Sequence, residues 1–313
     1  MAEKSDFLAE VSFFLSTFAA QNNMKTHHSI TRILVYLVCF LAPLIALRNL
    51  PNREDTLLSP WVIDVHLSLL FTLLVFLTAR LAKTNNTGLG VSATAAFLLL
   101  FCPGSEHFFN PSEESILELG SQCITPFFIG QYTRIRTKDF HYLYFLMLLM
   151  GIFCSYTHNG ITIPLCVCFL WLSFRNRRRF FRLAAWPMVI GFVIGTWLSL
   201  IHKHDEGVQV STNIESMTNT TSIVLTTLWE TKVFIVAMLL TAWLTMSKRG
   251  RSLLLSISRR NYIVTVCFIA ALCTVPLAPL GIDNAVTGVC FFCMFWVLFV
   301  SKHLIEKTTG KKF

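Results

Sequence analysis

The sequence predicts an all-α, polytopic integral membrane protein with about ten transmembrane helices. The chain is 54% hydrophobic and only 14% charged, a balance that soluble domains do not have. Apolar runs follow one another along the chain, and a spanning helix needs roughly 17–25 such residues. Lys and Arg gather in short clusters between these runs, which is the positive-inside pattern of membrane proteins. The same clustering argues against nucleic acid as a partner, although the net charge is +9.

Ten apolar segments are the expected helices. Segments 88–104, 121–134 and 160–174 are short for a full crossing and are expected to be tilted or re-entrant. Residues 1–30 are expected to form an amphipathic or juxtamembrane segment, 31–303 the transmembrane domain, and 304–313 a basic cytoplasmic tail. In chain order, the expected helices are 31–50, 61–83, 88–104, 121–134, 140–156, 160–174, 184–201, 228–246, 262–280 and 285–303.

The basic clusters set the orientation of the helices. When the chain alternates sides from a cytoplasmic N-terminus, every cluster falls on the inner side of the membrane. Both termini are then cytoplasmic. The clusters include RIRTK at 134–138, RNRRRFFR at 175–182, and the segment 247–260, which begins SKRGR and ends SRR.

Small residues inside the predicted spans are expected to serve packing. The ten cysteines lie almost entirely within apolar segments, where a free thiol packs as a small apolar group. Cys290 and Cys293 have CxxC spacing without a second pair or a nearby His, so they are not interpreted as a metal or redox site. Gly191 and Gly195 form a small-xxx-small motif, which favours close contact between two helices.

Polar residues recur in the outward turns. The stretch CSYTHNG places Tyr156, His158 and Asn159 between two apolar segments. It is either a hairpin turn, for which Asn-Gly is typical, or part of a hydrated site, because polar groups at membrane depth are costly without a role. Upstream, residues 105–120 predict a helix along the outer surface that begins near Asn110 or Ser112. That helix would hold a further set over the same cavity: His107, Glu113 and Glu114.

Glu54 and Asp55 follow the first span directly, beside Arg53. A carboxylate in this position can act as a general base or coordinate a divalent cation, and an arginine can contact phosphate. An acidic pair in a short loop can equally be solvated surface.

At these residues the chain resembles the membrane-embedded GT-C glycosyltransferases, which take sugar from a polyprenyl-phosphate carrier. The run LLLFCPGSEHFFNPSEESILELGSQCITPFFIGQYTRIR, followed by SYTHNG, is also similar to an uncharacterised family of bacterial, Bacteroides-type multi-pass proteins. The resemblance implies location in a bacterial inner membrane, with membrane lipid and a polyprenyl-phosphate-linked sugar as partners.

The resemblance also implies a mechanism. Asp55 or Glu54 would deprotonate an acceptor hydroxyl that attacks the anomeric carbon. His107, His158 and Glu113 or Glu114 would position hydroxyl groups. No cofactor is identified; a divalent cation is compatible with this mechanism but not required. The lipid phosphate would lie on the outer side near one of three basic residues: Arg53, Lys203 or Lys232.

Two other classes stay open on the sequence alone. A transporter or channel would use charges within the membrane, but Asp64 and His66 lie near a helix end and no internal repeat is detectable. A non-enzymatic membrane subunit of a polysaccharide assembly complex would lack a functional acidic cluster. An enzyme differs from both because its acidic and imidazole groups should meet in one cavity.

Overall fold

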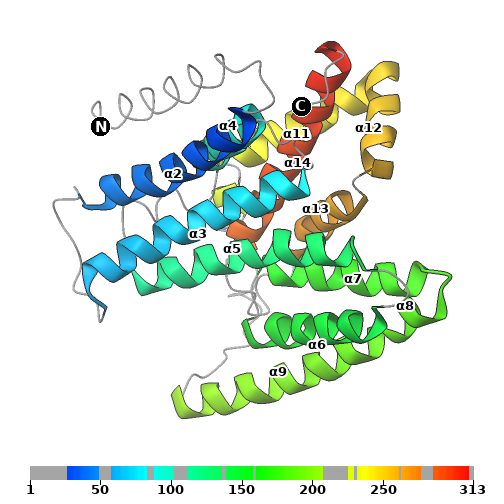
Figure 1. Ribbon diagram of the computed structural model, residues 1–313. Helices are drawn as coiled ribbons and strands as arrows, with labels where there is room; N and C mark the ends of the chain where they lie inside the picture. Colours follow the sequence, from blue (N-terminus) through cyan, green and yellow to red (C-terminus); the bar gives the residue numbers. More distant parts are fainter. Residues whose placement is uncertain are drawn as a thin grey trace. The chain divides into compact units, whose positions relative to one another are not determined.

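The computed structural model is all-helical over the residues that it describes, and no strand occurs among them (Figure 1). The described residues are 27–48, 58–82, 88–101, 112–135, 139–157, 160–206, 225–228, 231–260, 262–275 and 285–309. Each of the ten apolar segments predicted from the sequence overlaps a described helix, which confirms the helical class. The predicted N-terminal amphipathic segment lies outside the described residues up to residue 26.

The principal helices have the following bounds: α2 His27–Arg48, α3 Pro60–Leu81, α4 Gly88–Phe101, α5 Glu113–Tyr132, α6 Phe140–Thr157, α7 Thr162–Arg175, α8 Arg179–Leu183, α9 Ala185–Glu206, α11 Lys232–Met246, α12 Lys248–Arg260, α13 Tyr262–Thr274 and α14 Ala285–Thr309. The start of α5 agrees with the sequence. Ser112 caps it, because its hydroxyl accepts a hydrogen bond from the Ser115 amide at 3.2 Å.

Several helices have the length and composition to cross a membrane. Among the described residues there are four such helices, within α2, α3, α8–α9 and α14, or five if α11 and α12 form one bent span. The helices α4, α7 and α13 are apolar but short, with 14, 14 and 13 residues. The described helices therefore include four or five candidate membrane spans, and the full number of about ten stays a prediction.

The outer face of α9 supports the membrane assignment. Trp186, Val193, Trp197 and Leu200 are all more than 60% exposed, and their spacing of three, four or seven residues places them on one face of the helix. A soluble protein rarely exposes so large a continuous apolar surface. Such a face is suited to contact with the hydrocarbon chains of lipids.

The described chain divides into two compact units, of which the first contains residues 1–130 and 301–313. In this unit α2 packs on α3, and α4 contacts both. The thiol of Cys123 donates a hydrogen bond to the Leu70 carbonyl at 3.3 Å, which joins α5 to α3. The ammonium of Lys302 donates to the Ala82 carbonyl at the end of α3.

The second unit contains residues 131–300, and its closest helix pair is α6 with α9 (Figure 1). A Cβ atom at Gly151 would collide with the Met188 carbonyl of α9, and one at Gly191 would collide with the Leu148 carbonyl of α6. The hydroxyls of Ser155 and Thr196 share a hydrogen bond across the pair at 2.5 Å. The helix contact predicted for Gly191 is confirmed, because only glycine permits this approach.

The rest of the second unit is built around α7, α11, α13 and α14. The helix α7 packs on α13. The indole of Trp296 in α14 stacks on Phe268 of α13 and donates to the Thr241 hydroxyl of α11 at 2.9 Å. At the start of α14, Gly288 lies against the backbone of Gly160, which shortly precedes α7.

Free thiols complete this packing, as the sequence predicts. All nine described cysteines are free, and eight of them are buried, Cys273 being the exposed one. Several donate to nearby acceptors: Cys168 approaches the Ile263 carbonyl at 3.8 Å, which reinforces the contact between α7 and α13.

Candidate functional site

Most of the site residues predicted from the sequence lie outside the described residues. These are Arg53, Glu54, Asp55, His107, His158 and Asn159.

The other predicted residues lie in described helices. Glu113 and Glu114 begin α5, and Lys203 lies in the last turn of α9, but these three side chains lie outside the description. Tyr156 lies in the last turn of α6, and its side chain is 45% exposed. The roles predicted for these four residues stay predictions.

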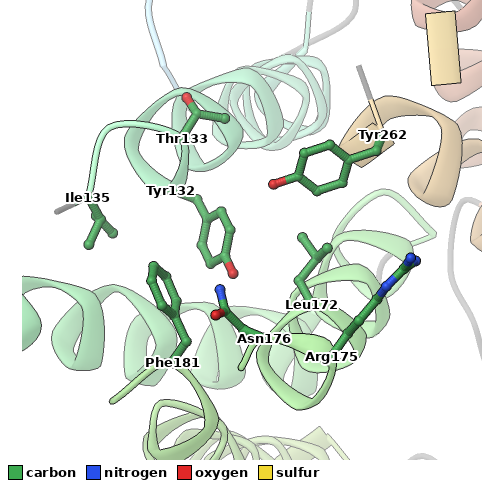
Figure 2. Close-up of a pocket in the computed structure, with 8 residues that line it drawn as sticks. All are labelled: Tyr132, Thr133, Ile135, Leu172, Arg175, Asn176, Phe181 and Tyr262. Atoms are coloured by element: carbon green, nitrogen blue, oxygen red, sulfur yellow. The ribbon is translucent and has the colours of Figure 1, made fainter. Parts of the chain in front are cut away.

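A pocket in the second unit offers a candidate site that the sequence did not indicate (Figure 2). It has a volume of about 270 Å³ and lies where the end of α5, the turn from α7 to α8 and the start of α13 meet. This volume is near the lower limit of small-molecule sites, which run from about 300 to 1,000 Å³. The pocket therefore suits a compact polar group. Its lining residues are Tyr132, Thr133, Ile135, Leu172, Arg175, Asn176, Phe181 and Tyr262.

Aromatic rings form a rigid wall of this pocket. The ring of Tyr132 stacks on Phe169 at 4.6 Å between centroids and packs against Phe181 at 5.9 Å. Tyr132 and Phe181 are both buried. These contacts fix the ring, and Figure 2 shows its hydroxyl pointing toward the amide of Asn176. Tyr262, which is more exposed, directs its hydroxyl toward the same space from the start of α13 (Figure 2).

The polar edge of the pocket presents hydrogen-bond donors. The side-chain oxygen of Asn176 accepts a hydrogen bond from the Arg178 amide at 3.0 Å. This bond leaves the NH₂ group of Asn176 as a donor toward the pocket. The Arg175 guanidinium lies 4.8 Å from the Trp171 ring centroid, a cation–π arrangement that turns it away from Tyr132 (Figure 2).

No carboxylate lines the pocket, and several arginines adjoin its lining residues along the chain. Arg134 follows α5, Arg177 and Arg178 lie in the turn before α8, and Arg179 begins α8. The side chains of all four are exposed. Three segments that the sequence placed on the cytoplasmic side thus contribute to one site: the turn after α5, the turn from α7 to α8, and the region where α12 leads into α13. An anion is the ligand that this electrostatic environment favours.

The first unit contains a buried carboxylate that does not line the pocket. Asp64 in α3 is 2% exposed, and the ring Nδ1 of the nearby His66 donates to the Val62 carbonyl at 2.7 Å. Among the described residues, no group of three His, Cys, Asp or Glu side chains is placed to hold a metal ion.

Comparisons of the chain with protein-family models, with curated proteins and with solved structures gave no match. The resemblance to GT-C glycosyltransferases therefore stays a prediction, and the function is argued from the pocket.

Proposed function

We propose that this chain is a membrane protein that holds a phosphate-bearing lipid, with the lipid headgroup in the pocket between Tyr132 and Tyr262. The observation that carries the proposal is the set of donors around the pocket. The two tyrosine hydroxyls and the Asn176 amide offer donors, arginines lie in the adjoining turns, and no carboxylate lines the space. Phosphate oxygens accept hydrogen bonds from such groups and gain most when the donor is charged.

The position of the pocket favours a lipid over a free anion. It lies at the ends of the apolar helices α7 and α13, beside basic turns of the kind that mark the cytoplasmic headgroup layer. The site is large enough for a headgroup and too small for an acyl chain in addition. The chain or chains of the lipid would therefore lie along the apolar helix surface.

This proposal includes the lipid class expected from the sequence, since a polyprenyl-phosphate sugar carries such a headgroup. It differs in location: the sequence placed the phosphate on the outer side near Arg53, Lys203 or Lys232, whereas the basic turns around the pocket are predicted to be cytoplasmic. Transfer of the sugar by Glu54 and Asp55 remains a separate part of the proposal and needs its own test.

Native mass spectrometry of the full-length protein tests the headgroup site. Tyr262→Glu places a negative charge at the pocket, whereas Tyr142→Glu makes the same change at a residue of similar exposure that does not line it; the two tyrosines are 45% and 42% exposed. Undecaprenyl phosphate and phosphatidylglycerol serve as probes. Loss of a charge-assisted hydrogen bond predicts about tenfold weaker probe binding in Tyr262→Glu only. Equal binding by the wild type and both variants would refute the site.

The same measurement addresses sugar transfer. In the double variant Glu54→Ala/Asp55→Ala, a protein that transfers sugar should retain its sugar-bearing lipid, because the base that activates the acceptor is absent. Identical lipids in this variant and the wild type would argue against transfer without affecting the headgroup site.

A further inference from the structure

The helix α12 follows a sharp bend in the chain and carries basic but no acidic residues. It follows α11 after one intervening residue, Ser247, and the two helices are bent by 118°. Its sequence, KRGRSLLLSISRR, contains five basic residues and no acidic residue. A bend of 118° places α12 nearer to the membrane plane than to the membrane normal when α11 runs along that normal.

The bend is built by specific contacts and does not depend on a flexible joint. The Ser247 hydroxyl caps α12 by accepting a hydrogen bond from the Gly250 amide at 2.8 Å. Gly250 itself is buried against the last turns of α11, where a Cβ atom would collide with the Leu244 carbonyl. The direction of α12 is therefore fixed relative to α11.

The apolar face of α12 is already occupied by protein. Gly250, Leu253 and Ile257 share one side of the helix, and Leu253 and Ile257 are 8% and 0% exposed. Helix spacing places Lys248, Arg251 and Leu255 on the opposite side, and these three side chains are exposed. The face that is free to meet a partner is therefore basic, with one exposed leucine at 60%.

We propose that this basic face of α12, defined by Lys248, Arg251 and Leu255, docks on the anionic headgroups of the bilayer surface. Charge complementarity selects the partner, because each Lys or Arg near an anionic membrane strengthens binding by roughly fivefold. Leu255 can enter the headgroup region beside the two cations, as apolar residues of interfacial helices do. The proposal is independent of the headgroup pocket, because none of these three residues lines it.

Hydrogen exchange on the full-length protein in lipid nanodiscs tests this proposal. Discs of phosphatidylcholine alone are compared with discs that contain phosphatidylglycerol, and the readout is amide exchange in peptides covering 247–260. We expect exchange to slow by about fivefold or more in the anionic discs, and this effect to disappear in Lys248→Gln/Arg251→Gln. High salt should reduce it, because the charges are exposed.

The matched control is Arg80→Gln/Lys307→Gln, which removes the same charge from two exposed positions that do not line the headgroup pocket. It should retain the lipid effect at 247–260. Equal exchange in both kinds of disc would overturn the proposal. Loss of the effect in both double variants would also overturn it, because net charge and not this face would then be responsible. Protection by an oligonucleotide in detergent, without any effect of anionic lipid, would assign the face to nucleic acid instead.

Discussion

At the scale of single residues, a few polar side chains connect the apolar helices of the second unit. The Trp296 indole, for example, stacks on Phe268 and also donates a hydrogen bond to Thr241. The Thr241 hydroxyl in turn donates to the Ala237 carbonyl at 2.7 Å. The Thr241 hydroxyl therefore links the Trp296 indole of α14 to the backbone of α11, because it accepts one hydrogen bond and donates another.

A double-mutant cycle on Trp296→Phe and Thr241→Val should measure this link. Phenylalanine keeps an aromatic ring against Phe268 but removes the indole N–H, so the coupling free energy should be about 0.6–1 kcal/mol. Unfolding of the purified protein in mixed micelles gives the four stabilities. Trp243→Phe, at an exposed position of α11, controls for the loss of an indole. Zero coupling would mean that the hydrogen bond contributes nothing beyond packing.

At the scale of elements, glycine decides which helices approach most closely. Gly151 and Gly191 sit at the crossing of α6 and α9, where each lacks room for a Cβ atom. At Gly120 in α5, by contrast, a Cβ atom would have open space around it. The two environments give opposite expectations for one substitution.

Gly191→Ala should lower the free energy of unfolding by about 1–3 kcal/mol, because the backbones must separate. Gly120→Ala should instead be neutral or raise it by up to about 1 kcal/mol, because alanine favours the helix. Thermal unfolding of both variants in detergent measures the difference. If Gly191→Ala were as stable as the wild type, this result would contradict the close packing of α6 against α9.

The positions of the apolar helices could be predicted well from the sequence, but the secondary structure of the basic segments between them was not predicted. For residues 247–260 it assigned only a side of the membrane, whereas the structure has the helix α12. The signal was present, since Gly250, Leu253 and Ile257 recur at helical spacing. The pocket could not be predicted in this way, because Tyr132 and Tyr262 come from distant segments and single-sequence patterns carry no information on long-range contacts. The roles predicted for Arg53, Glu54, Asp55, His107 and His158 stay predictions.

At the scale of the whole molecule, the number of crossings determines where the two termini lie. Four or ten spans place both ends on one side of the membrane, whereas five spans place them on opposite sides. The structure gives four described helices with the properties of a span, or five with the bent α11–α12 pair. If α12 lies on the membrane surface, α11 and α12 do not together form one membrane span.

We expect both termini on the cytoplasmic side, since the basic clusters require an even number of crossings. Terminal tags and protease digestion of oriented vesicles measure this directly. Tags on opposite sides would contradict the orientation and favour an odd number of crossings.

The short pair α7 and α13 has a consequence for the lipid itself. Helices of 14 and 13 residues are each about 20 Å long, whereas the hydrocarbon layer is about 30 Å thick. If both helices cross the membrane side by side, hydrophobic mismatch should thin the bilayer around them. Headgroups would then descend toward the proposed headgroup pocket, and acyl-chain length as well as headgroup chemistry would set how easily a lipid reaches it.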